Sequence, residues 1–140
     1  MEPSLSKSRY MIVGVDAATR FVFLGFTPTK GEANNVIQRT VTNINARRGA
    51  RTVKRVHSNN GGEFIGNNLE EWLEESGIKH TTSAPHTPEH NGLTERTIQI
   101  IVSSARTMLI VSGLPGKFWA EACRMAGLIR NLAPAKPLDA

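Results

Sequence analysis

Two neighbouring apolar runs near the start of the chain constrain its fold more than any other feature. Residues 10–15 and 21–26 are both rich in Val, Ile and Phe, and only the short polar stretch 16–20 separates them. β-Branched and aromatic residues favour strands, and a short polar connector between two such runs favours a hairpin. The sequence therefore predicts a β-hairpin with Asp16 as a residue of its turn.

The rest of the sequence alternates helix and strand patterns. Apolar residues recur at helical spacing in 32–48 and 93–111, which Gly49 and Gly113 terminate. The remaining predicted elements are strands at 53–58 and 78–82, helices at 67–76 and 118–132, and a proline-rich loop at 83–92. This order of elements predicts a mixed α/β fold in a single domain.

The chain is basic, with 17 Lys and Arg against 12 Asp and Glu and a formal net charge of +5. Such a charge favours a polyanionic partner, although an ordinary basic domain would explain it equally well. The charges are unevenly distributed along the sequence. Basic residues gather in 47–55, whereas acidic residues gather in 70–75, where a solvated helix face is the simplest explanation.

Cys123 is the one cysteine of the sequence, which excludes an internal disulfide and fits a reducing intracellular compartment. It lies in an apolar helical stretch, so we expect a buried structural thiol rather than a nucleophile. The sequence contains no run of 18 apolar residues, so neither a membrane span nor a membrane partner is expected.

Three passages carry a resemblance to a known family. Residues 57–64 read HSNNGGEF, residues 77–96 read GIKHTTSAPHTPEHNGLTER, and residues 114–122 read LPGKFWAEA and are followed by Asn131. In order and spacing they resemble the patterns DNGGEF, GI.H..S.P.TPQQNGVAER and LP..FW.EA......N of copia-type retrotransposon integrase catalytic cores. The likeness runs from about Arg9 to Leu138 and so covers nearly the whole chain.

The resemblance implies an α/β fold of the ribonuclease-H-like superfamily, a mixed sheet flanked by helices. It also implies that the first, central strand is missing, so we expect a loose lead-in at 1–8, a partial catalytic core at 9–112 and a C-terminal helical extension at 113–140. Either strand 10–15 then pairs with strand 53–58, or interior backbone groups stay unpaired at about 1–3 kcal/mol each and the chain is marginally stable.

In this family two aspartates and one glutamate hold two divalent ions, Mg²⁺ or Mn²⁺, that assist phosphodiester chemistry. The last two acids match Asn59 and Glu95, which stand with the family's separation of 35 residues between them. Glu95 therefore corresponds to the third acid, although the helix dipole also favours a glutamate in a first turn. Asn59 corresponds to the second aspartate but carries no charge, so no tightly bound metal is expected.

Other candidates for metal ligands are weaker. Asp16 resembles the acid at the end of the family's second strand rather than a catalytic acid, and turn chemistry accounts for it. An enzyme that uses Asp16, Glu95 and Glu63 is the least favoured hypothesis. A zinc site is not expected from the four histidines, because the family's zinc module lies upstream and uses two cysteines. These histidines are His57, His80, His86 and His90.

Charge and resemblance together suggest residues that contact nucleic acid. They are Asn60, His90, Asn91 and Arg96 from the motifs, and Arg48, Arg51 and Lys54 from the basic stretch. Residues 95–99 read ERTIQ where the family typically reads ERKNR, so only Arg96 remains of this basic group. We therefore expect fewer phosphate contacts from this helix and a smaller salt dependence of binding.

The leading hypothesis is a relic or fragment of a retrotransposon integrase core. The family implies DNA integration and nucleic-acid binding by a metal-dependent polynucleotidyl transferase, but strand transfer is not expected here. Weak, salt-dependent DNA binding, a homodimer, and a nuclear or cytoplasmic location follow as expectations. Two alternatives stay open, namely a domesticated DNA- or protein-binding module and a pseudogene product without function.

Overall fold

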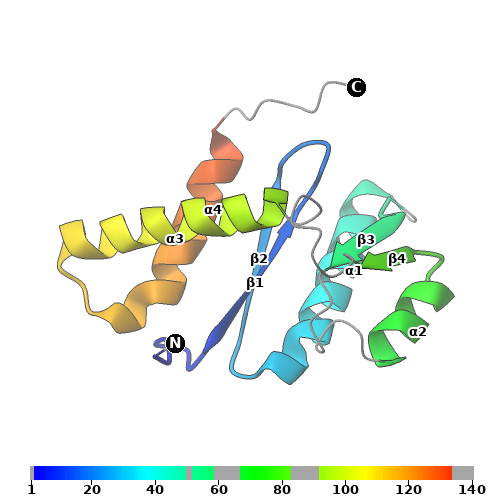
Figure 1. Cartoon of the computed structure of the whole chain (residues 1–140), viewed down its shortest axis with the longest axis horizontal. Helices are drawn as coiled ribbons and strands as arrows, with labels where there is room; N and C mark the ends of the chain where they lie inside the picture. The colour runs from blue at the N-terminus through cyan, green and yellow to red at the C-terminus, as the bar shows by residue number, and fades with distance from the viewer. Residues whose placement is uncertain (1, 50–51, 59–66, 83–91, 134–140) are drawn as a thin grey trace. The chain divides into compact units, whose positions relative to one another are not determined.

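The computed structural model of the chain describes residues 2–49, 52–58, 67–82 and 92–133. These residues form two compact units, one made of Met1–Thr29 with Gly92–Ala140 and the other of Lys30–Asn91. Figure 1 shows the helices and strands of both units. We call them the hairpin unit and the parallel-strand unit.

The hairpin unit is built on two antiparallel strands, β1 (Tyr10–Val15) and β2 (Val22–Thr27). Their register runs from Tyr10 opposite Thr27 to Val15 opposite Val22. At the turn, the Asp16 N–H donates to the carbonyl of Phe21 at 2.9 Å, and the Arg20 N–H donates to the carbonyl of Asp16 at 2.8 Å. The predicted hairpin is confirmed, with the second strand one residue later than expected.

Two helices pack on this hairpin (Figure 1): α3 (Gly92–Ser112) contacts β1, and α4 (Trp119–Leu132) contacts β2 and α3. Gly113, with φ at 71°, ends α3, and the short 3-10 helix η4 (Gly116–Phe118) leads into α4. The predicted helices 93–111 and 118–132 are therefore confirmed. Their buried core comprises Val22, Ile101, Ala105, Trp119, Ala120, Ala122, Cys123 and Ala126.

The opposite face of α4 is also apolar. Met125, Leu128, Ile129 and Leu132 follow the i, i+3, i+4, i+7 spacing of one helix face, and all four side chains are exposed. Beyond the buried Trp119, the helix therefore buries small residues, such as Ala122 and Ala126, and exposes these four large ones.

The segment before β1 makes specific contacts with the start of α4. The Trp119 Nε1–H donates to the carbonyl of Glu2 at 2.8 Å. The Leu5 N–H donates to the carbonyl of Lys117 at 3.0 Å. These bonds hold residues 2–5 against the start of α4. The domain boundaries expected at 1–8, 9–112 and 113–140 stay predictions.

The parallel-strand unit begins with the 3-10 helix η1 (Lys30–Glu32) and α1 (Ala33–Arg48). It continues with β3 (Arg55–Ser58), α2 (Asn67–Glu75) and β4 (Lys79–Thr82). The four predicted elements are confirmed to within two residues at each boundary. Val41, Leu69, Leu73 and Ile78 form their buried core, and Trp72 is half-buried against it.

β3 and β4 pair in parallel, with Arg55 opposite Lys79, Val56 opposite His80, His57 opposite Thr81 and Ser58 opposite Thr82. Among the described strands, hydrogen-bonded pairing gives two two-stranded sheets, β1–β2 and β3–β4. The alternative in which strand 10–15 pairs with strand 53–58 would join the two units and stays a prediction. The local turn at Asp16 closes β1 onto β2, whereas the buried Ile78 and the half-buried Val56 hold β3 and β4 together.

Candidate functional site

Glu95, the residue at the third acid position, lies in the first turn of α3 with its side chain exposed. The helix dipole stabilises a carboxylate in this turn. The Arg96 guanidinium lies near Gly92. A Cβ built on that glycine would lie 3.9 Å from the Arg96 Nη2 atom. The first turn of α3 thus displays one acid and one base.

The residue after Arg96 stands where the resembled family typically has a lysine. Thr97 is buried, and its hydroxyl donates to the carbonyl of Leu93 at 2.8 Å. A lysine at this position would have to leave the interior to keep its charge solvated. Residue 97 therefore serves packing in this chain rather than phosphate contact.

Asp16, the weaker candidate for a metal ligand, stabilises the turn of the hairpin. Its Oδ1 accepts hydrogen bonds from the Ala18 N–H at 2.9 Å and from the Thr19 N–H at 3.3 Å. A carboxylate that accepts backbone bonds two and three residues ahead is an Asx-type turn. The turn role predicted for Asp16 is confirmed, and a catalytic role stays untested.

At the carboxyl ends of β3 and β4, two pairs of polar side chains join the strands. The Ser58 Oγ and His80 Nε2 atoms lie 2.8 Å apart. The His57 Nδ1 and Thr81 Oγ1 atoms also lie 2.8 Å apart. Asn59, the residue at the second acid position, follows Ser58 directly in the sequence, so these pairs brace the strand that leads to it.

Sequence reasoning missed these two pairs. It considered His57 and His80 only as metal ligands, because the parallel register of the strands is not visible in the sequence. The signal present is weak: each of the two predicted strands ends in polar residues, His57 and Ser58 in one and His80, Thr81 and Thr82 in the other.

Several candidate site residues lie outside the described part of the chain, namely Asn59, Asn60, Glu63, Arg51, His86, His90 and Asn91. Asp16, Glu95 and Arg96 belong to the hairpin unit, whereas Arg48 and Lys54 belong to the parallel-strand unit. Within residues 2–49, 52–58, 67–82 and 92–133, no group of three or more His, Cys, Asp and Glu side chains gathers as a metal site would require.

The described cations of the basic stretch lie at the end of α1 and at the start of β3. Arg47 and Arg48 are exposed in the last turn of α1, and Lys54 and Arg55 are exposed at the start of β3. The Asn45 Oδ1 accepts a hydrogen bond from the Val53 N–H at 3.1 Å, which ties these two groups of cations together. The structure therefore brings Arg48 and Lys54 into one region.

Two residues of the α4 segment have structural roles. The Asn131 side chain accepts from the Val22 N–H at 2.7 Å and donates to the Val22 carbonyl at 2.9 Å.

Cys123 is a free, buried thiol, as predicted, and burial raises the pKa of this thiol. A raised pKa keeps the thiol protonated and unreactive at neutral pH.

The sequence matches the integrase core domain family over residues 3–88, which is more than half of the chain. It is 35% identical over 135 residues to the retrovirus-related Pol polyprotein from transposon TNT 1-94 of Nicotiana tabacum, covering 96% of this chain. It is 36% identical over 131 residues to the corresponding polyprotein from transposon RE1 of Arabidopsis thaliana, covering 94% of this chain. The chain spans only 10% and 9% of the lengths of these two relatives.

Solved structures show the same fold. A chain of the simian T-cell lymphotropic virus intasome, solved in complex with PP2A regulatory subunit B56 gamma, superposes with a TM-score of 0.72 at 21% identity. That match covers 91% of this chain and 44% of the other chain. The catalytic core domain of BIV integrase superposes with a TM-score of 0.67 at 20% identity, covering 90% of this chain and 77% of that one.

These matches define the class of protein as a mixed α/β fold of the ribonuclease-H-like type, as the three motifs predicted. The chain belongs to the integrase core domain family, and its relatives at 35% and 36% identity are retrotransposon Pol polyproteins of plants. In the part of the chain that the structure describes, no helix is both long enough and apolar enough to cross a membrane.

Proposed function

We propose that this chain is a segment of a retrotransposon integrase core that binds nucleic acid without catalysing strand transfer. The observation that carries the proposal is Asn59 at the position of the family's second aspartate, with 35 residues between it and the exposed Glu95. An amide offers a metal one oxygen of similar shape but no charge.

The residues available as metal ligands do not fit a pair of divalent ions. When bound, such ions polarise the phosphodiester and activate the attacking hydroxyl. The chain offers Glu95 as a carboxylate and Asn59 as an amide, while Asp16 already uses Oδ1 in two backbone hydrogen bonds. Removing one charge at about 4 Å in a medium of dielectric near 20 costs about 4 kcal/mol, and a dication feels it more strongly.

Nucleic-acid binding is supported by the net charge of +5 and by the exposed cations Arg48 and Lys54. These groups attract a phosphate backbone whether or not a metal is bound. The same support fits a domesticated DNA-binding module, which would differ in being produced in cells as a separate protein. A pseudogene product without function would be absent from cells, so detection of this segment by mass spectrometry argues against it.

The metal part of the proposal is tested by restoring the missing charge. Asn59→Asp is expected to tighten Mn²⁺ binding by tenfold or more, because a charged oxygen replaces an amide. Asn68→Asp, at an exposed position of α2, makes the same change of charge elsewhere and serves as the matched control. Calorimetric titration with Mn²⁺ that gives equal affinities for both variants would argue against the proposed defect.

The catalytic part is tested with the full chain and a DNA duplex that carries a pre-processed 3′ end. No strand-transfer product is expected with Mg²⁺ or Mn²⁺. Product that forms with the parent chain and disappears with Glu95→Gln would overturn the proposal.

A homodimer and a nuclear or cytoplasmic location remain predictions. Light scattering of the purified chain tests the first, and microscopy of a tagged copy tests the second.

A further inference from the structure

The outward face of the β3–β4 pair is a polar surface that the proposed function has not used. Side chains alternate between the two faces of a strand. Val56 and Ile78 pack in the core of the parallel-strand unit, so Arg55, His57, Lys79 and Thr81 lie on the opposite face. We call these four residues the outer tetrad.

The register places two cations side by side at one end of the outer tetrad. Arg55 is opposite Lys79, and both side chains are exposed. The Lys79 N–H donates to the carbonyl of Lys54 at 3.0 Å, which continues the pairing one residue beyond Arg55. Like charges placed directly opposite in a sheet are destabilising, so this arrangement does not contribute to folding.

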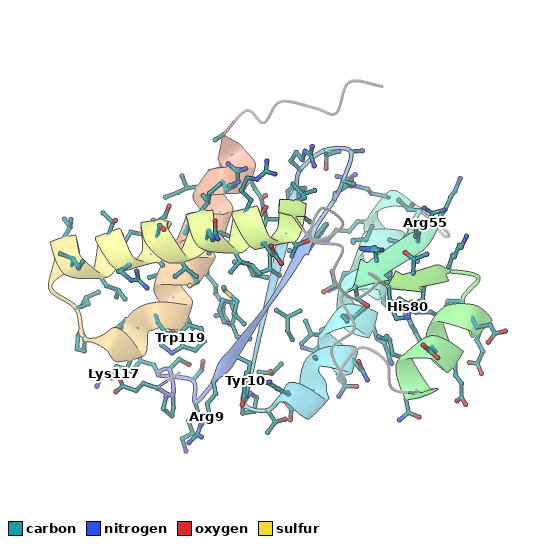
Figure 2. All side chains as sticks on the ribbon, viewed as in Figure 1. Arg9, Tyr10, Arg55, His80, Lys117 and Trp119 are labelled. Atoms are coloured by element: carbon teal, nitrogen blue, oxygen red, sulfur yellow. The ribbon has the colours of Figure 1, made fainter. Side chains whose placement is uncertain are left out.

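The other end of the outer tetrad is fixed by the hydrogen bond between His57 Nδ1 and Thr81 Oγ1 at 2.8 Å. A phosphate ligand prefers cations beside groups that hydrogen-bond to oxygen, and the outer tetrad combines both kinds. In Figure 2 the Arg55 side chain extends away from the strands, whereas His80 lies on the side of β4 that faces α2. The two faces of the strand pair are therefore chemically distinct.

The same unit carries further exposed cations. Arg47, Arg48 and Lys54 are exposed, and the bond from Val53 to Asn45 joins their two segments. The acidic side chains of the unit's second helix, α2, are also exposed: Glu70, Glu71, Glu74 and Glu75. These four acidic residues of α2 and the cations of α1, β3 and β4 therefore lie on different elements.

We propose that the outer tetrad, with Arg55 and Lys79 as its charged centre, contacts the phosphate backbone of duplex DNA. This inference rests on the proposed nucleic-acid binding and names a surface for it. Arginine offers a planar fork of donors to phosphate oxygens, and a neighbouring lysine adds a mobile point charge. Strands lie about 4.8 Å apart, so the two cations reach the same phosphate or adjacent ones.

The test compares two double variants of the full chain that each change the net charge by two, from +5 to +3. Arg55→Gln with Lys79→Gln removes the charged centre. Arg39→Gln with Arg106→Gln removes two exposed cations from α1 and α3 and is the matched control. Binding to a labelled DNA duplex is followed by fluorescence anisotropy over a series of KCl concentrations.

We expect the first double variant to bind more weakly and to make the negative slope of log K against log salt concentration shallower by about two. The control is expected to change that slope by less than half as much. Because opposed like charges are removed, the thermal midpoint of the first variant should be equal to or above that of the parent. The exchange of Arg55→Lys with Lys79→Arg keeps both charges and should bind as the parent does.

The outcomes separate the two levels of the proposal. A parent chain that does not bind DNA overturns both the proposed nucleic-acid binding and the role of the outer tetrad. DNA binding by the parent that both double variants retain, or lose equally, overturns the role of the outer tetrad alone. Displacement of DNA by polyglutamate as effectively as by unlabelled DNA overturns the assignment to phosphate.

Discussion

Asn131 shows how one side chain can satisfy the backbone of a strand. Its amide accepts from the N–H of Val22 and donates to the carbonyl of Val22, at 2.7 and 2.9 Å. Both groups are part-buried, where an unpaired donor or acceptor costs about 1–3 kcal/mol. The asparagine of the third motif is therefore explained by the backbone it satisfies, 109 residues away in the sequence.

Asn131→Leu should lower the free energy of unfolding by about 2 kcal/mol, because it leaves the N–H and carbonyl of Val22 without partners. Asn43→Leu makes the same chemical change at an exposed position of α1 and should have little effect. Urea denaturation followed by tryptophan fluorescence measures both variants. Equal losses for the two would show that the amide contributes nothing specific.

At the scale of elements, the junction from α2 to β4 shows a local signal that the sequence carries in full. The Gly77 N–H donates to the carbonyl of Glu74 at 3.0 Å, and the Ile78 N–H donates to that of Leu73 at 2.8 Å. This is the Schellman pattern, in which the residue after the helix adopts positive φ. Gly77 has φ at 72°, and Ile78 and Leu73 belong to the same buried core.

Gly77→Ala should destabilise the chain by about 1–2 kcal/mol, since a Cβ disfavours the left-handed region. Gly31→Ala is the control, because a Cβ at Gly31 would meet no atom within 4 Å. The control should be neutral or slightly stabilising through reduced freedom of the unfolded chain. Thermal unfolding by circular dichroism distinguishes these outcomes, and a neutral Gly77→Ala would contradict the role given to the turn.

The elements could be predicted because their signals are local. Gly49, Gly77 and Gly113 all adopt positive φ where the sequence placed helix ends. The pairing of β3 with β4 could not be predicted, because parallel register depends on residues more than 20 positions apart that share no turn.

The candidate site was predictable only as positions in a motif. Glu95 was placed at the start of a helix and is there, and Asp16 was placed in a turn and is there. The links between His57 and Thr81 and between Ser58 and His80 were missed, because each joins two strands.

At the scale of the whole molecule, each of the two units has a core of its own. Ile101 is fully buried in the core of the hairpin unit, and Leu73 is fully buried in that of the parallel-strand unit. Truncating a buried Leu or Ile to Ala typically costs 2–5 kcal/mol. A whole domain has a net stability of only about 5–15 kcal/mol, so either truncation is a large fraction of it.

Leu73→Ala should increase amide exchange most strongly in α2 and β4, whereas Ile101→Ala should do so in α3 and α4. The reason is that each side chain packs with residues of its own unit. Hydrogen exchange read by mass spectrometry, with each variant serving as control for the other, measures this difference. Identical exchange profiles for the two variants would mean that the chain opens as one cooperative body.

By itself, the sequence determined the type and order of the helices and strands, the helix ends and the family, because periodicity, glycine positions and short motifs act over a few residues. Only the tertiary structure decided that Asn131 satisfies Val22, that Thr97 faces inward and that Arg55 stands beside Lys79. The contacts of Asn131 and Arg55 join distant segments, and the burial of Thr97 depends on the packing around its helix. No local sequence pattern specifies these contacts or this burial, so both follow from packing and strand register once the chain has folded.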